Sequence, residues 1–270
     1  MPLTISAGAA TDVGRVRTVN EDSFCVRPRL WAVADGMGGH AAGDRASQIA
    51  VEALSGLAAT GPFDLTDLHR VLAEANDTMI EESRTIDAPR GMGTTVAGVA
   101  VVTVSGTDQV AVFNIGDSRV YRYQDAGLSQ VTVDHSEVQE MIASGRLDPA
   151  AARTYPRRNV VTRSLGVSGV ESADTWLLPL QPDQLFLICS DGLTGELGDA
   201  EIAACLREEA APAETAQRLV DLAVAAGGSD NVTVVVLRTE AVPEPGEDTE
   251  DTTPKLNVSQ LRDALREGTP

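Results

Sequence analysis

The chain carries the sequence LWAVADGMGG at residues 30–39, an apolar run that ends in an acid and a series of glycines. A short apolar run bounded by glycines is typical of a strand buried on both faces. Two more stretches join an apolar run to an acid, LFLICSDG at 185–192 and SDNVTVVV at 229–236. Because a buried strand delivers its terminal residues to the rim of the core, we expect these acids to meet at one rim.

A fourth acidic cluster, Asn20-Glu21-Asp22, precedes another strand-like segment. Carboxylate and carbonyl oxygens are hard ligands, which suit Mg²⁺ or Mn²⁺ and not a soft metal. A single Asp-Gly pair is more simply a turn. Four such clusters in one chain, three of them beside apolar strands, instead favour a shared metal site.

The composition restricts the class of protein. The chain has 270 residues, of which 43% are hydrophobic, enough for one large domain or two small ones. The net charge of −19, from 40 acids and 21 bases, disfavours binding to nucleic acid or anionic lipid. We found no signal peptide and no apolar run near the roughly 18 residues that span a bilayer. We therefore expect a cytoplasmic protein without membrane insertion.

The chain contains three cysteines, Cys25, Cys189 and Cys205, which are widely spaced and form no Cys-x-x-Cys pair. An odd number of isolated cysteines is typical of a reduced cytosolic protein, and it makes a zinc site improbable.

Strand and helix patterns divide the chain into two β-rich blocks, each with a pair of helices. Apolar periodicity predicts helices that begin near residue 43 and after Asp64, a helix over 136–144, and two more over 199–209 and 213–226. Sequential strands joined by short turns argue against a doubly wound parallel sheet. We predict an α+β fold, a four-layer α-β-β-α sandwich of two mainly antiparallel sheets flanked by helices. The predicted strands are 23–28, 30–35, 94–104, 109–115, 118–123, 172–178, 184–190 and 231–238.

The composition changes after Glu240. Residues 241–254 contain acids, threonines and prolines with almost no apolar side chains, which is typical of a disordered linker. Beyond them Val258, Leu261 and Leu265 have helical spacing, over a short helix at 257–267. We predict a folded domain at 1–240 and an acidic disordered tail at 241–270, and a frayed tail is an equal alternative because short helices are unstable alone.

Six motifs resemble those of the metal-dependent protein phosphatases, the type 2C serine/threonine class, in its bacterial form. They occur in the order and at the spacing of that family, over about residues 5–238. The motifs are GRVRTVNEDS at 14–23, VADGMGGH at 33–40, GTT at 93–95, NIGDSR at 114–119, SDGL at 190–193 and GSDNVT at 228–233.

The resemblance implies hydrolysis of phosphoserine and phosphothreonine by attack of a metal-bridging water at a two-metal centre. It implies two Mn²⁺ or Mg²⁺ ions and a third, weaker one. Two cations neutralise a dianionic phosphate and generate a nucleophile at neutral pH, so the chemistry agrees with the ligand set. The partners implied are phosphoserine/phosphothreonine proteins, with serine/threonine kinases and their substrates. We expect a monomer.

The resemblance also implies a role for each site residue. Asp35 bridges both metals, and Asp191 and Asp230 complete the shell of one. Glu21 and the carbonyl of Gly36 hold the other metal, which Asp22 supports through water. Arg17 grips the substrate phosphate, for which its forked guanidinium is suited. Asp117, with Asp191, holds the third metal. The catalytic residues implied are thus Arg17, Asp35, Asp191 and Asp230.

Two positions depart from the family pattern. Met37 stands where many eukaryotic members have a histidine regarded as the general acid, which leaves a metal-bound water and His40 as alternatives. Tyr155 stands where histidine is frequent in the flap of bacterial members, here about residues 134–166. This second departure affects substrate contacts and not the metal site.

Two other functions remain open. A catalytically silent pseudophosphatase, acting as a regulatory binding module, would keep the fold; the complete set of acids argues against it. A metal-dependent nuclease or phosphodiesterase also uses carboxylate metal sites, but one lysine and the acidic charge argue against a nucleic-acid substrate.

Overall fold

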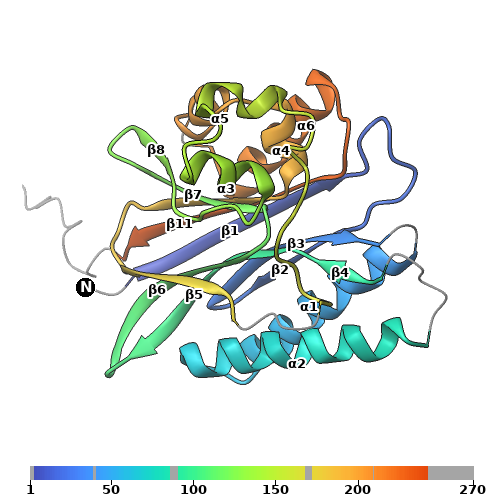
Figure 1. Cartoon of the computed structure of the whole chain (residues 1–270). Coiled ribbons are helices and arrows are strands. Elements are labelled where there is room, and N and C mark those ends of the chain that lie inside the picture. The colour runs from blue at the N-terminus through green and yellow to red at the C-terminus, as the bar shows by residue number, and fades with distance from the viewer. Residues whose placement is uncertain (1–2, 39–40, 86–90, 168–171, 209, 243–270) are drawn as a thin grey trace, which may run out of the picture.

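Two antiparallel β-sheets stacked face to face form the centre of the structure, a computed structural model that describes residues 3–38, 41–85, 91–167, 172–208 and 210–242 (Figure 1). Their strand orders are β1-β11-β10-β7-β8 and β2-β3-β5-β6-β9, and β4 pairs with β3. The first sheet contains β1 (Leu3–Asp12), β7 (Arg119–Gln124), β8 (Gly127–Gln130), β10 (Leu185–Cys189) and β11 (Val232–Ala241). The second contains β2 (Asp22–Arg27), β3 (Leu30–Met37), β4 (Gly93–Thr94), β5 (Val96–Val104), β6 (Thr107–Ile115) and β9 (Asp174–Pro179).

Helices cover the outer faces of both sheets. The second sheet packs on α1 (Ala41–Ala59), against which α2 (Leu65–Ser83) lies, and the first packs on α6 (Pro212–Ala226) beside α4 (Asp191–Glu196) and α5 (Asp199–Leu206). The predicted cap Asp64 begins α2 through a reciprocal capping box with Asp67. Between β8 and β9 lie α3 (Glu137–Ala143) and the 3₁₀ helix η1 (Pro149–Thr154), which belong to the flap.

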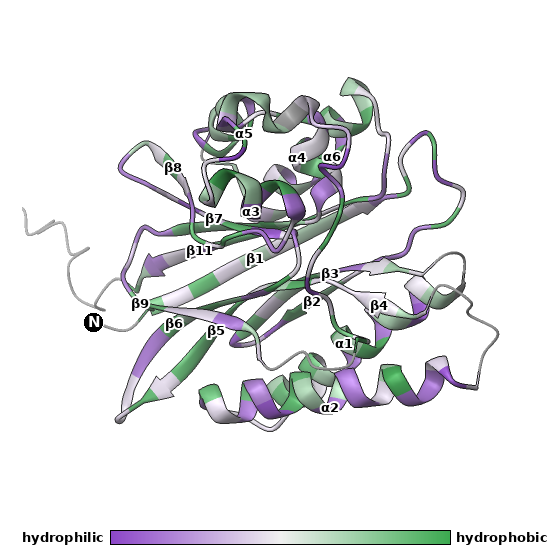
Figure 2. Ribbon diagram, in the orientation of Figure 1, coloured by the Kyte–Doolittle hydropathy of each residue, from purple (hydrophilic) through white to green (hydrophobic). Residues whose placement is uncertain are grey.

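The central strands are apolar on both faces because each face meets a different core. In β10, Leu185, Leu187 and Cys189 pack against the helices, whereas Phe186 and Ile188 pack between the sheets. Strand β5 alternates in the same way. Figure 2 shows apolar residues along these strands and alternating polar and apolar residues along α2. Three apolar layers between four structural layers confirm the predicted α-β-β-α sandwich.

The strand prediction was incomplete at the sheet edges. It omitted β1 and β8, and it ended the last strand at residue 238. Strand β11 continues to Ala241 because its last residues pair with β1, where Ala241 lies opposite Leu3. Since β1 was not predicted, the sequence offered no reason to extend its partner. Ala241, predicted as the first residue of the tail, is the last residue of β11. The tail beyond Val242, with its predicted helix at 257–267, lies outside the described residues.

Candidate active site

Asp22 and Asp35 lie side by side on two neighbouring strands. Strands β2 and β3 pair antiparallel with Asp22 opposite Asp35. Thr95 holds the other side of Asp35: its hydroxyl accepts the Asp35 N–H at 3.1 Å, and its own N–H donates to the Asp35 carbonyl at 2.9 Å. Strand pairing with β2 on one side and the contacts with Thr95 on the other therefore fix the position of Asp35 beside Asp22.

Asp22 is buried beneath the strand ends of the opposite sheet. The Ser190 hydroxyl donates to Asp22 Oδ2 at 2.8 Å and accepts the N–H of Thr233 at 3.0 Å. Asp22 Oδ1 has no hydrogen-bond partner among the described residues. Burial, with the nearby charges of Asp191 and Asp230, raises the pKa of Asp22 to about 7.

Asp191 and Asp230 come from the first sheet. Asp191 is the first residue of α4 and is separated from β10 by Ser190 alone, and Asp230 lies just before β11. The two segments touch at Gly192, where an added Cβ would lie only 2.0 Å from the Asn231 carbonyl oxygen. The absence of a side chain at position 192 thus lets the start of α4 pack against the residue next to Asp230.

The Asn231 side chain organises the loop before β2. It accepts the Glu21 N–H at 2.9 Å and donates to the carbonyls of Val13 and Val19, both at 3.0 Å. This loop carries Arg17 and Glu21. Asn231 was not among the predicted site residues, and its only signal in the sequence is its place beside Asp230 in the SDN motif.

Gly36 brings the predicted Glu21 and Gly36 ligands together. Its N–H donates to the Glu21 carbonyl at 3.2 Å. An added Cβ would lie 2.1 Å from the Gly43 carbonyl oxygen and 2.6 Å from the Glu21 carbonyl oxygen. Any side chain at position 36 would force these segments apart, so glycine is required by the packing.

Asp117 is presented by the β6–β7 loop. Gly116 before it has a φ of +111°, and an added Cβ there would lie 2.6 Å from Thr95 Cβ. Asp117 is itself buried. Burial, together with the charge of Asp191, raises its pKa to about 7.

The predicted site residues surround one cavity of 350 Å³, the central cavity. Asp22 does not line it but pairs with Asp35, which does. The structure therefore brings together every residue predicted for the site. Those lining the cavity are Arg17, Glu21, Asp35, Gly36, Asp117, Asp191 and Asp230.

The carboxyl groups of this cavity repel one another. Burial raises the pKa of Asp35 well above its usual range, and the charges of Asp22, Asp191, Asp117 and Asp230 raise it further. Burial, followed by the charge of Asp230, raises the pKa of Asp191. Mutually repelling, buried oxygen donors are the environment that a hard divalent cation would stabilise, so the residues fit Mn²⁺ or Mg²⁺.

The side chains are not closed around an ion in this arrangement. Within the described part of the chain, no three acidic, histidine or cysteine side chains form a group that could hold one. Asp230 is turned towards Arg17, whose Nη2 donates to its Oδ2 at 2.7 Å. Rearrangement of acidic side chains, with Asp230 leaving Arg17, would therefore accompany metal binding.

Comparison with known proteins decides the family. The family model described as protein phosphatase 2C matches residues 15–224. The chain belongs to the protein phosphatase 2C family.

Bacterial serine/threonine phosphatases are among the curated relatives of this phosphatase. The serine/threonine phosphatase stp of Listeria innocua is 36% identical over 238 residues, which are 84% of this chain and 93% of that protein. The serine/threonine protein phosphatase PstP of Mycobacterium tuberculosis is 37% identical over 236 residues, 87% of this chain but 45% of that longer protein.

Solved structures agree with the fold of this phosphatase. The crystal structure of Mycobacterium tuberculosis PstP has a TM-score of 0.81 at 36% identity and covers 88% of this chain and 99% of that one. The catalytic domain of PstP in complex with two manganese ions also has a TM-score of 0.81, at 34% identity, over 89% of this chain and 100% of that one. The family, fold, enzyme class and metal dependence predicted from the sequence are confirmed, and no comparison supports the pseudophosphatase alternative.

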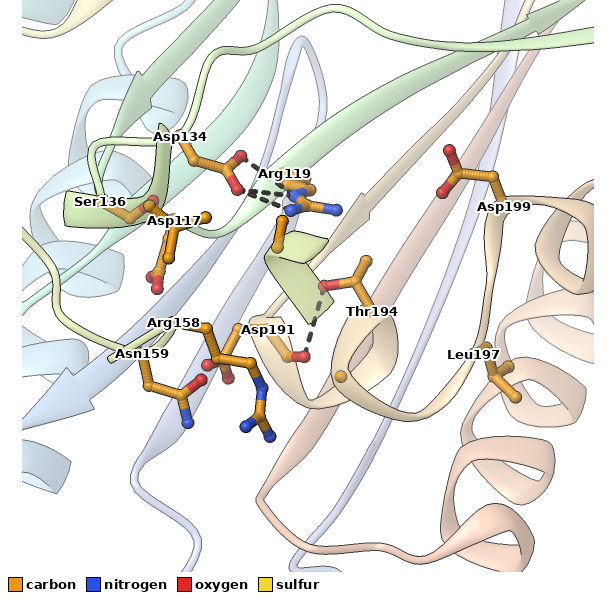
Figure 3. A pocket seen from close by; sticks show the side chains of 13 residues that line it. Asp117, Arg119, Asp134, Ser136, Arg158, Asn159, Asp191, Thr194, Leu197 and Asp199 are labelled. Carbon is orange, nitrogen blue, oxygen red and sulfur yellow. Dashed lines mark hydrogen bonds and ion pairs between the residues drawn. The ribbon is translucent and has the colours of Figure 1, made fainter. Parts of the chain in front are cut away.

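A second cavity of 370 Å³, the flap cavity, adjoins the central one and shares Asp117, Asn159 and Asp191 with it. Figure 3 shows Arg158 and Asn159 of the flap beside Asp191, with the Arg119–Asp134 ion pair on another wall. Arg119 Nη2 donates to Asp134 Oδ2 at 2.6 Å. Neither Asn159 nor this ion pair was assigned to the site from the sequence.

The structure describes some of the remaining residues singled out in the sequence and leaves others outside the described ranges. Met37 lines the central cavity, whereas His40 lies outside the described residues. Tyr155 ends η1 within the flap. All three cysteines are buried and unpaired. None of the helices in the described ranges is long and apolar enough to cross a membrane.

Proposed function

We propose that this phosphatase hydrolyses phosphoserine and phosphothreonine esters in proteins through the residues that meet in the central cavity, with Mn²⁺ or Mg²⁺ as cofactor. The observation that carries the proposal is the convergence of partly buried acids from both sheets, Asp35 from one and Asp191 and Asp230 from the other, on a cavity that also contains Arg17. Acids gathered in this way repel one another and destabilise the folded protein unless a bound cation compensates their charge.

The acids divide between the metal positions as the family pattern implies. Asp35 would bridge two ions, with Asp191 and Asp230 on one side and Glu21 and the Gly36 carbonyl on the other. Asp22, held by Ser190, would act through water, and Asp117 with Asp191 would hold a third ion. The chemistry that bound cations supply is neutralisation of the phosphate charge and a water that ionises near neutral pH.

Arg17 binds the phosphate of the substrate. Its side chain is about half exposed, at 51%, so an incoming phosphoprotein reaches it from solvent. The forked guanidinium donates two parallel hydrogen bonds to phosphate oxygens. Because Asp230 holds Arg17 at the cavity, substrate binding at Arg17 and cation binding at Asp230 are coupled.

The leaving serine or threonine oxygen needs a proton. Met37 lines the cavity and has none to give. We assign this step to a water molecule in the central cavity acting as general acid.

The biological setting follows from the substrate class. We propose that the substrates are proteins phosphorylated by serine/threonine kinases, and the kinases themselves. We propose further a cytoplasmic monomer with its phosphatase domain at residues 1–240 and an acidic tail at 241–270. The net charge of −19 supports the exclusion of nucleic acid.

Hydrolysis of p-nitrophenyl phosphate and a phosphothreonine peptide tests the function. We expect no turnover in chelator, recovery with Mn²⁺, and loss of roughly three orders of magnitude in kcat for Asp35→Asn, because a neutral amide cannot balance the metal charge. Asp221→Asn, on the exposed face of α6, is the matched control. Full activity in chelator, or an active Asp35→Asn variant, would refute the proposal. Phosphopeptide binding without turnover would instead identify a pseudophosphatase.

A further inference from the structure

His135 lies at the base of the flap, where the two ends of that segment meet. Its carbonyl accepts the N–H of Thr162 at 2.8 Å, and the next residue, Ser136, forms a β-bridge with Val161. We call Asp134–Ser136 and Val161–Arg163 the flap base. The sequence alone offered only a local role for His135, as a cap or hinge.

The same histidine is bonded to the loop that presents Asp117. The Gly116 N–H donates to His135 Nδ1 at 2.9 Å, and the His135 N–H donates to the Gly116 carbonyl at 2.9 Å. Asn114 Nδ2 donates to that carbonyl as well, at 3.0 Å. Both polar groups of the Gly116 backbone are thus occupied by His135, one residue before Asp117.

The bond from Gly116 determines the tautomer of the ring. A nitrogen that accepts a hydrogen bond carries no proton, so the neutral imidazole has its proton on Nε2. Nε2 lies 3.3 Å from Asp174 Oδ2. Arg163 Nη1 lies 2.8 Å from Nε2, which in this tautomer is a contact between two donors, and it donates to Asp174 Oδ1 at 2.7 Å. The Asp174 carboxylate therefore accepts from both donors and fixes the ring from the side opposite Gly116.

The ring is kept neutral by its surroundings. His135 is 9% exposed, and burial followed by the charge of Arg163 lowers its pKa. A proton on Nδ1 would point at the Gly116 N–H, so the Gly116 bond requires a ring whose Nδ1 is unprotonated.

We propose that His135 is a positioning residue, whose Nδ1 fixes the Gly116 amide, sets the placement of Asp117 in the active site and ties that placement to the flap base. The inference rests on the proposed function in that Asp117 serves as a metal ligand. Groups that orient metal ligands affect affinity although they do not touch the ion. Movement of the flap base and cation binding at Asp117 are then linked through one imidazole.

Three substitutions separate the two ends of the ring. In His135→Asn the amide oxygen falls near the place of Nδ1 and can still accept from Gly116. In His135→Gln the amide group falls near the place of Nε2, so the contact with Asp174 is kept and the Gly116 contact is lost. His135→Ala removes both. The control is His69→Asn, which changes a histidine of α2 that is hydrogen-bonded to Thr175 of β9.

The first measurement is hydrogen exchange of the Gly116 amide by NMR in the metal-free protein. We expect protection in the wild type, His69→Asn and His135→Asn, and exchange roughly tenfold or more faster in His135→Gln and His135→Ala. The second is Mn²⁺ titration by calorimetry with steady-state kinetics. The Gln and Ala variants should keep the tight pair of ions but need roughly tenfold to a hundredfold more Mn²⁺ for full activity, with rescue in Asn.

Two results would overturn the inference. One is unchanged Gly116 exchange in His135→Ala; the other is equal impairment of the Asn and Gln variants, which would show a role in packing alone. If the Gly116 exchange follows the expectation but Mn²⁺ demand does not change, Asp117 placement does not depend on His135 and the inference also fails. A wild type without Mn²⁺-dependent turnover would refute the proposed function instead, which the exchange measurement does not assume.

Discussion

At the scale of single residues, uncharged polar side chains position the charged ones. Thr95 holds the backbone of Asp35, Ser190 holds the carboxylate of Asp22, and Asn231 holds the loop of Glu21. Each supporting group is fixed by its own backbone pairing or by further hydrogen bonds. Reactive groups held this way lose little entropy when substrate binds, which is the usual basis of a preorganised site.

Arg17 offers a test at this scale. Arg17→Ala should raise KM for a phosphothreonine peptide roughly tenfold or more with the fold intact, because two charge-assisted hydrogen bonds are lost. Arg17→Lys should recover part of the loss, since a lysine supplies charge without the fork. Steady-state kinetics in saturating Mn²⁺ measures both, with Arg84→Ala at the exposed end of α2 as control. Unchanged kinetics for Arg17→Ala would exclude phosphate binding by this residue.

At the scale of elements, the central strands could be predicted and the edges could not. Strands β5, β10 and β11 are apolar runs whose burial on both faces leaves a clear pattern. Strand β1 contains alanine, glycine and serine, which have weak strand preference, and it forms because β11 pairs with it. Helix α4 begins at Asp191 and contains two glycines, so its sequence predicts a turn; Leu193 and Leu197 are buried and hold it in place.

In the candidate site, too, some residues could be predicted from the sequence and others could not. The acids could be named because they end apolar strands and match family motifs. The contacts of Asn231 and His135 join residues far apart in the chain, Glu21 and Asn231 for example, and only the folded structure shows them. Short motifs identify the candidate acids, whereas the groups that hold these acids in place depend on register and packing.

The two glycines of α4 provide a matched pair for a test of this element. Gly192→Ala should destabilise the protein and remove most activity, since its Cβ would lie 2.0 Å from the Asn231 carbonyl oxygen. A Cβ added at Gly195 would have no other atom within 4 Å. Gly195→Ala should therefore leave the stability of the protein unchanged or raise it, by up to about 1 kcal/mol. Thermal unfolding and p-nitrophenyl phosphate hydrolysis compare them. A stable, active Gly192→Ala variant would contradict the account of how Asp191 and Asp230 are brought together.

At the scale of the whole molecule, the candidate active site lies across the two sheets. Asp22 and Asp35 belong to one sheet, and Asp191 and Asp230 flank strands of the other. The apolar layer between the sheets therefore sets the distances between the acids. Cations bound there would connect the two halves of the fold, so metal binding should contribute to global stability.

The pH dependence of that stability can be predicted. Asp22 and Asp117 have folded-state pKa values of about 7 against 3.8 for the free side chain. The folded protein thus binds more protons, and these groups stabilise it fully below pH 3.8 and lose that effect as the pH rises through about 7. In chelator, the melting temperature should therefore fall as the pH rises through about 7, because Asp22 and Asp117 ionise. Saturating Mn²⁺ should raise it more at about pH 8 than at about pH 6, because fewer protons compete for the carboxylates.

Calorimetric scans of the metal-free protein across this pH range provide the measurement. Asp117→Asn, which cannot titrate at that position, should flatten the profile in chelator. Equal stabilisation by Mn²⁺ at both pH values would show that these carboxylates are already ionised in the folded protein.

The pairing of β1 with β11 has a consequence for synthesis on the ribosome. Strand β1 emerges early, but its hydrogen-bonding neighbour is the last strand of the fold, with Leu3 opposite Ala241. Until β11 has been translated, β1 has no strand to join and its backbone groups stay unpaired, a condition that favours aggregation. The second sheet can begin to assemble sooner, because its strands β2, β3 and β5 are closer together in the chain. Completion of the first sheet, and with it the placement of Asp230, must therefore wait until nearly the whole domain has left the exit tunnel.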